Sequence, residues 1–234
     1  MNKQFRLINV TSDITTLTNN NLQLVNSDSN EKWTYVKTNT NNTLTYGIKT
    51  VLGNNSSSGL LSTASGYNTT ASGNWSTTSG YNTTASGVSS FASGANNTAS
   101  GYASIVSGTN SIASGYSSTA SGYNTTASGD YSTTSGFNTT AFGNYSTASG
   151  SGSNAIGDNS TASGNYTTAS GDNSTTSGNY TTASSYSSTA SGGYTTASGN
   201  YSTTSGYSTT ASGHNSIASG NNTLASANNS VTLG

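Results

Sequence analysis

The stretch Tyr67-Asn68-Thr69-Thr70-Ala71-Ser72-Gly73 is a seven-residue unit whose close variants fill most of the chain, so the fold must accommodate its repetition. Twenty-five such heptads follow one another from Leu60 to Gly234 without an insertion or a deletion. Glycine closes all of them except the two that end at Ser185 and Ala227. A random low-complexity tract would lose this register within a few units. The periodicity therefore predicts an ordered repeat.

Two kinds of heptad alternate, so the structural unit is fourteen residues long. Heptads that start at residue 60 and at every fourteenth residue after it, here called first-type heptads, always carry serine at position three. The intervening second-type heptads carry threonine there in nine of twelve cases. Position five is alanine except at six residues, all in first-type heptads: Thr78, Val106, Thr134, Thr176, Thr204 and Thr232. The alternation predicts a coil with two unlike sides.

A parallel β-solenoid explains this pattern better than a helix or a collagen-like chain. Ser, Thr, Asn and Gly are poor helix formers, and no apolar stripe recurs at helical spacing. A collagen triple helix needs glycine at every third residue and abundant proline, and this chain has no proline. In stacked coils every backbone N–H of a strand pairs with a neighbouring coil. Proline has no N–H to donate, so its absence also fits this arrangement. We predict an all-β fold over residues 59–234, a parallel β-solenoid of 14-residue coils with two short strands each.

Each heptad position has an expected place in the coil. Positions three to six alternate between the two sides of a strand, so positions three and five face a narrow lumen while four and six face outward. The closing glycine suits a turn with positive φ or a close backbone approach. Positions one and two lie at corners, where Asn and Asp tolerate left-handed conformations. At about 4.8 Å per coil, the repeat makes a rod of about 60 Å.

Residues 1–58 form a second, irregular region that holds eight of the eleven charged residues. Its Trp33-Thr34-Tyr35-Val36 run favours short strands over helix, because β-branched and aromatic residues are enriched in strands. The start of the chain, Met1 to Val10, lacks the sustained apolar run of a secretory signal. No segment has the length and apolarity of a transmembrane helix. We expect this region to serve in capping or assembly.

Composition excludes several classes of function. Only 5% of the residues are charged and the formal net charge is −1, so the clustered Lys and Arg of a nucleic-acid footprint are missing. Without cysteine, neither disulfides nor thiolate metal sites are possible. A polar, glycine-rich composition usually predicts disorder, but the strict register overrides that interpretation here.

The repeat resembles the head domain of YadA-type trimeric autotransporter adhesins, whose 14-residue coils carry motifs of the form Ser-Val-Ala-Ile-Gly. The nearest matches are Ser153-Asn154-Ala155-Ile156-Gly157 and Ser230-Val231-Thr232-Leu233-Gly234, followed by residues 216–220 and 111–115. The resemblance covers residues 60–234. It implies a left-handed parallel β-roll on an extracellular cell or virion surface, usually trimeric, with Val and Ile packed at the trimer axis. This chain departs from that pattern, because its positions four and six are mostly threonine and serine.

Few residues are candidates for chemistry. His214 is the only histidine and lies at a turn position, so no metal cluster or catalytic triad can form around it. Asp130, Asp158 and Asp172 share position one of first-type heptads, and the last two are expected about 4.8 Å apart. Solvated turn carboxylates explain them more simply than a cation site, since no other acidic ligand repeats with them. We expect no enzyme activity and no catalytic, cofactor or metal site, because a straight rod offers no walled cleft.

Tyrosine and asparagine recur at fourteen-residue intervals, which predicts ladders along the rod. Stacked aromatic rings stabilise a solenoid edge, and asparagine amides can hydrogen-bond along the axis. The alternative for the tyrosines is a strip that binds a glycan or a receptor. The asparagine ladder is Asn68, Asn82, Asn96, Asn110, Asn124 and Asn138; the tyrosine ladders are Tyr166, Tyr180 and Tyr194, with the pairs Tyr67–Tyr81, Tyr102–Tyr116 and Tyr131–Tyr145.

Three functions fit these features. The one we favour is a non-enzymatic structural subunit of an extracellular surface fibre or filament, assembled from copies of itself end to end, as a trimer, or both. The second is an adhesin head that binds a receptor or glycan. The third is an ice-binding solenoid, suggested by regular Thr-X-Ser rows. Against the third, Thr-Ala-Ser occurs in both heptad types, whereas one ice-binding face would need only one.

The end-to-end expectation rests on the last heptads, which are the most apolar of the repeat. A bare solenoid end exposes unpaired strand edges and core. Residues 1–58 of a neighbouring copy, with Leu, Ile, Val and Trp33 to bury, are expected to cover it, and a head-to-tail contact that does not close gives a filament. The residues assigned to this assembly end are Ile217, Leu224, Val231 and Leu233.

Overall fold

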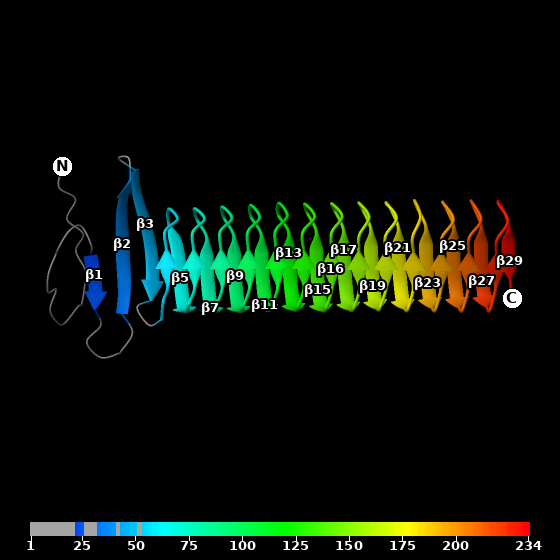
Figure 1. The fold of residues 1–234 in the computed structure, drawn as a ribbon, viewed down its shortest axis with the longest axis horizontal. Coiled ribbons are helices and arrows are strands. Elements are labelled where there is room, and N and C mark those ends of the chain that lie inside the picture. Colours follow the sequence, from blue (N-terminus) through cyan, green and yellow to red (C-terminus); the bar gives the residue numbers. More distant parts are fainter. Residues whose placement is uncertain (1–21, 26–31, 41–42, 51–52) are drawn as a thin grey trace, which may run out of the picture.

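The protein, seen in a computed structural model, is a stack of β-coils. The structure describes residues 22–25, 32–40, 43–50 and 53–234, and every regular element in these ranges is a strand. The same ranges contain no helix able to cross a membrane. Figure 1 shows the coils in a straight row, with three N-terminal strands at one end and the C-terminus at the other. The predicted all-β parallel solenoid is confirmed.

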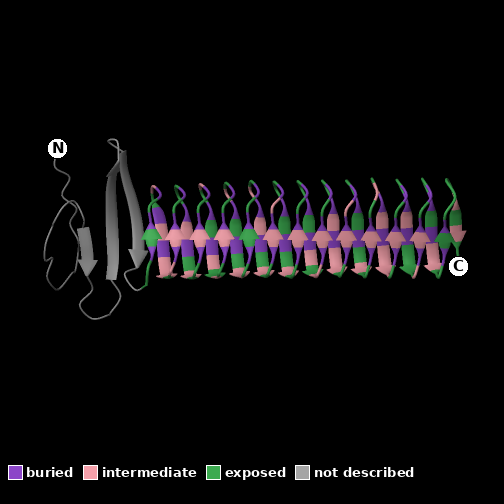
Figure 2. Cartoon of the chain, in the orientation of Figure 1, coloured by how far each residue is buried: buried purple, intermediate pink, exposed green. Residues whose placement is uncertain are grey.

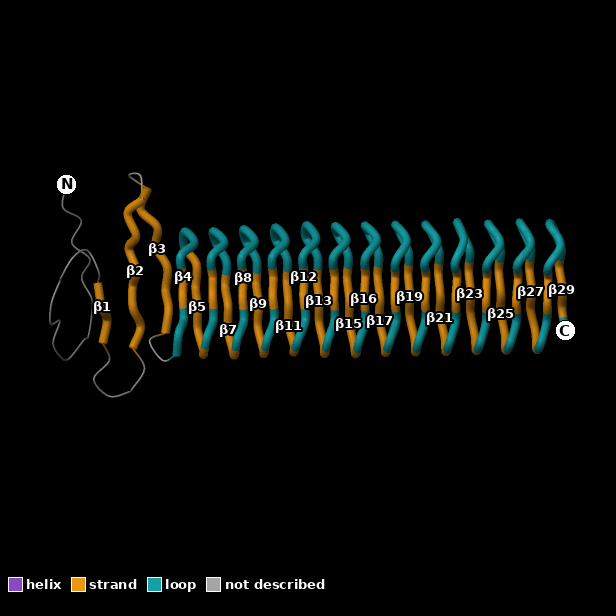
Figure 3. Tube along the Cα trace, viewed as in Figure 1, coloured by secondary structure: helices purple, strands orange, loops and turns teal. Residues whose placement is uncertain are grey.

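Two parallel stacks of strands make the coils, as the tube in Figure 3 shows. Each first-type heptad contributes a long strand to one sheet, and each second-type heptad contributes a short strand to the other. The long strands are β5 (Ser62–Tyr67), β7 (Thr77–Tyr81), β9 (Phe91–Ala95), β11 (Ile105–Thr109), β13 (Thr119–Tyr123), β15 (Thr133–Phe137), β17 (Thr147–Ser151), β19 (Thr161–Asn165), β21 (Thr175–Asn179), β23 (Thr189–Gly193), β25 (Thr203–Tyr207), β27 (Ile217–Asn221) and β29 (Val231–Leu233).

The short strands have two residues each. They are β4 (Ser56–Ser57), β6 (Thr70–Ala71), β8 (Thr84–Ala85), β10 (Thr98–Ala99), β12 (Ile112–Ala113), β14 (Thr126–Ala127), β16 (Thr140–Ala141), β18 (Asn154–Ala155), β20 (Thr168–Ala169), β22 (Thr182–Ala183), β24 (Thr196–Ala197), β26 (Thr210–Ala211) and β28 (Leu224–Ala225). The outward sides of the two sheets are called the long-strand face and the short-strand face below.

Residues fourteen apart are strand partners throughout the stack. Ala71 pairs with Ala85 in the short-strand sheet, and Thr63 pairs with Thr77 in the long-strand sheet. Backbone hydrogen bonds between coils accompany this register; for example, Ser72 N donates to Ala85 O at 2.9 Å. The predicted fourteen-residue coil is therefore confirmed.

The N-terminal strands extend the chain's own long-strand sheet. β1 (Leu22–Val25) and β2 (Lys32–Thr40) pair antiparallel, and so do β2 and β3 (Thr43–Thr50). β3 then pairs in parallel with β5. The predicted strand at Trp33–Val36 lies within β2.

The regular coils begin before residue 59, because β4 pairs with β6 as every later short strand pairs with the next. Residues 1–21, 26–31, 41–42 and 51–52 of the predicted N-terminal region lie outside the described part of the chain. Of the strands β1 to β3, β3 pairs with β5 of the same chain, and β1 and β2 follow it outward in the sheet. Their engagement by a neighbouring copy stays a prediction.

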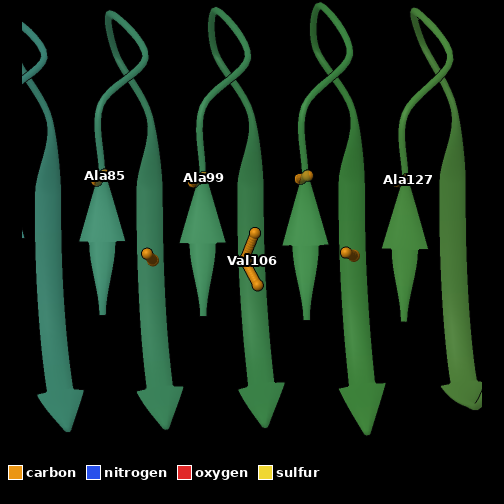
Figure 4. Packing of buried hydrophobic residues seen from close by; sticks show 7 residues of the cluster. Ala85, Ala99, Val106 and Ala127 are labelled. Carbon is orange, nitrogen blue, oxygen red and sulfur yellow. The ribbon is translucent and has the colours of Figure 1, made fainter. Parts of the chain in front are cut away.

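Small side chains fill the lumen. Alanines at position five, such as Ala85, Ala99 and Ala127, are fully buried, and Val106 is the largest buried apolar residue among them. Figure 4 shows these side chains between the strands of the two sheets. Thr126, at position four, is partly exposed, and Figure 2 shows the same alternation of buried and exposed residues along the rod. The predicted inward and outward positions are confirmed.

The two corners of each coil differ. In first-type heptads, positions one and two are the central residues of a β-turn, in which Ser76 N donates to Gly73 O at 3.2 Å. We call this the turn corner. At the other corner, the strand corner, the long strand continues through Gly80, with φ 123°, and ends at Tyr81. Position one of the second-type heptads therefore lies at a corner, as predicted, but in a continued strand and not in a β-turn, because the glycine φ redirects the chain without ending the ladder.

Candidate functional site

The corners carry 15 of the 17 aromatic side chains of residues 53–234, and their backbone is unusual. Every residue at position two, from Leu61 to Asn229, has a positive φ; for the non-glycine residues φ lies between 50° and 59°. Asparagine tolerates this left-handed conformation, but Trp75 and Tyr131 adopt it as well. The repeat thus holds bulky residues in a conformation that a free chain rarely visits, and their side chains project from the corners.

At the turn corner, the rings form two runs. Tyr102 stacks on Tyr116 with centroids 4.9 Å apart, and Tyr131 stacks on Tyr145 at 5.0 Å. A tilted contact between Tyr116 and Tyr131, at 5.3 Å, joins the two pairs into a four-ring run. Further along, Tyr201 makes edge contacts with Tyr186 at 5.5 Å and with His214 at 5.6 Å.

At the strand corner, the rings form three runs. Tyr67 stacks on Tyr81 at 5.6 Å, and Tyr123 stacks on Phe137 at 5.3 Å. The third run is a ladder of successive contacts: Tyr166 to Tyr180 at 5.1 Å, Tyr180 to Tyr194 at 5.2 Å, and an edge contact from Tyr194 to Tyr207 at 5.6 Å. The Tyr123–Phe137 pair was not predicted, although its fourteen-residue spacing is present in the sequence.

The ring of Tyr131 shows how the neighbours affect one another. Loss of solvent raises the pKa of its phenol above the ordinary value, and the charges of Tyr116, Tyr145 and Asp130 add to this effect. All four effects raise the pKa, because a phenolate at this position would be less solvated and close to other negative groups. The neighbouring groups therefore favour the neutral phenol of Tyr131.

The asparagine ladder at the strand corner is hydrogen-bonded at two of its steps. Asn82 Nδ2 donates to Asn96 Oδ1 at 3.2 Å, and Asn124 Nδ2 donates to Asn138 Oδ1 at 2.6 Å. Asn68 and Asn110 occupy the same column with the same positive φ. These exposed amides can also hydrogen-bond to water. Placing asparagines on successive coils therefore does not by itself produce an amide–amide hydrogen bond at every step.

The three aspartates act as acceptors for the backbone of the preceding coil. Asp130 Oδ1 accepts from Tyr116 N at 2.8 Å, Asp158 Oδ1 from Asn144 N at 2.7 Å, and Asp172 Oδ1 from Asp158 N at 3.0 Å. Asp158 and Asp172 therefore lie on successive coils, as expected. This arrangement gives each carboxylate a structural partner at the turn corner.

His214 is exposed at the turn corner, where its backbone N donates to Asn228 Oδ1 at 2.9 Å. Its ring meets Tyr201 edge-on. No group of three or more His, Cys, Asp or Glu residues that could hold a metal ion occurs in the described ranges. Phenols and amides are therefore the most frequent functional groups at the corners, beside three carboxylates and one imidazole at the turn corner.

The outer faces are rows of threonine and serine interrupted by a few apolar residues. On the long-strand face, Phe91 and Ile105 are strand partners and are 39% and 45% exposed. On the short-strand side, Phe142 and Ile156 occupy position six of successive second-type heptads and are 57% and 44% exposed. Exposed apolar neighbours of this kind mark contact sites more often than isolated ones do.

The predicted assembly residues near the C-terminus do not form one patch. Ile217 pairs with Val231, and Leu233 lies in the same long-strand sheet, paired with Ser219. Leu224 belongs to the short-strand sheet instead. All four side chains are exposed. The structure thus divides them between two faces, and their role in assembly stays a prediction.

One comparison with known proteins finds a family. The model described as the YadA head domain repeat matches residues 57–77, 64–90, 85–111, 92–118, 113–133, 135–160, 162–184 and 211–234, which cover more than half of the chain. No curated protein matches the chain.

Proposed function

The chain belongs to the family of YadA head domain repeats, and on this premise we propose that it is a non-enzymatic structural subunit of an extracellular surface fibre, built from associated copies of itself. The observation that carries the proposal is the unbroken stack of coils through residues 53–234. Such a stack is a rigid spacer, since every coil pairs with its neighbours along the axis. Heads of this family belong to surface adhesins, which supports a place outside the cell.

The outer faces suit lateral association between copies. The stack carries only three charged side chains, Asp130, Asp158 and Asp172, and all three lie at the turn corner. Uncharged faces meet without the repulsion that like charges would cause. Phe142 and Ile156 stand where other second-type heptads have serine, so we propose that they contact a second copy.

The experiment compares the oligomeric state of the wild-type protein with that of a Phe142→Ser/Ile156→Ser variant. Both substitutions restore the residue that the repeat uses at position six, so the fold should persist, as circular dichroism would verify. Sedimentation should show associated wild-type rods and a dissociated variant. A Ser114→Ala/Ser128→Ala variant on the same face is the matched control and should associate normally. A monomeric wild-type protein at high concentration would contradict the proposal.

An adhesin head is the second candidate, favoured by the exposed aromatic runs at both corners. Tyrosine combines a broad apolar ring with a polar hydroxyl, which suits contact with glycans and receptors. Glycan-array binding by the intact protein tests this function. Loss of binding in a Tyr180→Ala variant, with retention in a Thr182→Ala variant, would support it. Equal binding by both variants would argue that the tyrosine corner takes no part.

A further inference from the structure

Tyrosine is the main oxidisable side chain of the rod. The protein has no cysteine, its one methionine is Met1, and Trp75 is the single tryptophan beyond residue 52. Cysteine and methionine are the residues that oxidation usually attacks first. Thirteen of the fifteen tyrosines lie at the corners of the coils, with 42–62% of each side chain exposed. A one-electron oxidant that meets this surface therefore acts chiefly on phenols.

The tyrosines are arranged in pairs on successive coils. Tyr102 and Tyr116 are stacked with their ring planes 5° apart, and Tyr131 and Tyr145 with theirs 7° apart. Both members of each pair occupy the same heptad position. Their rings leave equivalent points of neighbouring coils, so equivalent edges of the two phenols lie side by side. Each ring is thus held next to a second phenol before any reaction begins.

We propose that these stacked pairs are sites of oxidative coupling, in which a peroxidase-type one-electron oxidant joins neighbouring coils covalently. Each phenol loses one electron and one proton, and the two tyrosyl radicals form a carbon–carbon bond between the ring carbons next to their hydroxyls. The hydrogen on each bonded carbon then moves to the oxygen, which restores both phenols. The two electrons and two protons reduce one hydrogen peroxide to two waters.

Such bonds would reinforce a fibre that has no cysteine for disulfides. A bond between Tyr131 and Tyr145 closes a loop over one coil, and so opposes the separation of two strands at the corner. The inference goes beyond the proposed function, because it concerns a covalent modification of the rod and not the assembly of copies. Coupling within one chain and association between chains are measured separately.

The chain contains its own control for this chemistry. Tyr123 stacks on Phe137 with centroids 5.3 Å apart and planes 9° apart, which is the same geometry as in the tyrosine pairs. Phe137 has no hydroxyl and gives no phenoxyl radical, so this pair cannot couple. The pair also shows that phenylalanine maintains the stack, and a Tyr→Phe substitution therefore removes reactivity without removing the ring.

The test treats the dilute, full-length protein with a haem peroxidase and hydrogen peroxide, followed by an endoproteinase that cleaves before aspartate. Cleavage at Asp130 and Asp158 releases residues 130–157, whose only tyrosines are Tyr131 and Tyr145. We expect this fragment to lose two hydrogen atoms in mass and to show dityrosine fluorescence. The treated chain should still migrate as a single chain under denaturing conditions. The same treatment of urea-unfolded protein should give several-fold less of the coupled fragment.

Two variants complete the test. Tyr145→Phe should abolish the mass loss in fragment 130–157, while Tyr102–Tyr116 coupling persists in the preceding fragment. Phe137→Tyr should create a new link from Tyr123 to residue 137, which sequencing of the joined fragments would identify. The proposal is overturned if fragment 130–157 keeps its mass in the oxidised folded protein, if coupling occurs only between chains, or if folded and unfolded protein couple equally.

Discussion

The lumen and the outer faces of this rod are built from the same strands, yet they accept very different residues. Position five, inside, is alanine in most coils, and Ala127 and Ala141 are fully buried. Position four, outside, ranges from threonine to Phe91 and Leu224. Close packing limits the volume of an inner side chain, whereas an outer one meets solvent. Outward residues that differ from the repeat consensus can therefore contact other molecules without disturbing the fold. Inward residues that differ from it must still fit the lumen.

The largest loss of stability is expected where a substitution adds an atom at a point where the backbones of two coils touch. In Gly136→Ala, the new Cβ would lie 2.0 Å from Gly150 O, and φ is 126°. Backbone strain and overpacking together should cost about 3–5 kcal/mol of unfolding free energy. Thermal or urea unfolding of the variant measures the loss.

Gly129→Ala is the matched control, because its Cβ would meet Gly143 O at the same 2.0 Å without a positive φ. Its column already contains Ser185 in place of glycine. We expect Gly129→Ala to lower the free energy of unfolding by less than Gly136→Ala does. Equal losses at the two sites would show that the close approach, and not the φ angle, dominates.

The next prediction compares the two sides of one short strand. Ala127→Leu forces a large side chain into the lumen and should destabilise the protein by about 1–3 kcal/mol or more. Thr126→Leu places the same side chain on the partly exposed outer face and should have a milder effect. Urea unfolding of the two variants gives both values. Similar shifts in the urea midpoint of the two variants would show that a large side chain costs no more stability in the lumen than on the outer face.

Within the lumen, the threonine hydroxyl groups differ in whether they form a hydrogen bond. Thr134 Oγ1 is buried without a hydrogen-bond partner among the described residues, whereas Thr125 Oγ1 donates to Ser111 Oγ at 2.9 Å. Replacing an unpaired buried hydroxyl by a methyl of similar shape removes a desolvation penalty of about 1–3 kcal/mol. Thr134→Val should therefore raise the melting temperature, and Thr125→Val should lower it. Destabilisation by both would show that Thr134 is hydrogen-bonded in solution.

The smallest expected effect is on the pH dependence of stability, through Tyr131 on the outside of the rod. The pKa of Tyr131 is raised in the folded protein above its ordinary 10.0, so the folded state holds this proton more tightly than the unfolded state. The resulting stability is present below about pH 10 and is lost as the pH rises through the folded pKa. Melting temperatures from roughly pH 9 to roughly pH 12 should fall less steeply in Tyr131→Phe than in the wild type. Parallel plots of melting temperature against pH for the two proteins would contradict a raised pKa of Tyr131 in the folded state.

Much of the fold could be predicted because the repeat is strict. The alternation of small and larger residues at positions three to six assigned Ala71 inward and Thr70 outward, as the structure has them. The fourteen-residue period also placed Tyr166 beside Tyr180. Both inferences use only the two-residue period of a strand and the stacking of equal coils.

The candidate surfaces were predicted less completely. The contact of Tyr116 with Tyr131 spans fifteen residues and joins position one to position two, so no simple period signals it. The asparagine amides bond at some steps and not at others, because exposed amides exchange partners with water. Side-chain orientation at a corner depends on the local backbone, which spacing does not specify.

The coil length, the register of the coils and the inner and outer positions follow from the amino-acid sequence alone, because side-chain volume and a two-residue period specify them. That one corner is a β-turn and the other a continued strand is visible only in the folded chain, since both corners contain similar Gly-X-X segments that differ in glycine φ. The same holds for the continuation of the long-strand sheet from β5 into β3. That pairing joins a segment without a repeat to one with a repeat, and no period in the sequence records where the two meet.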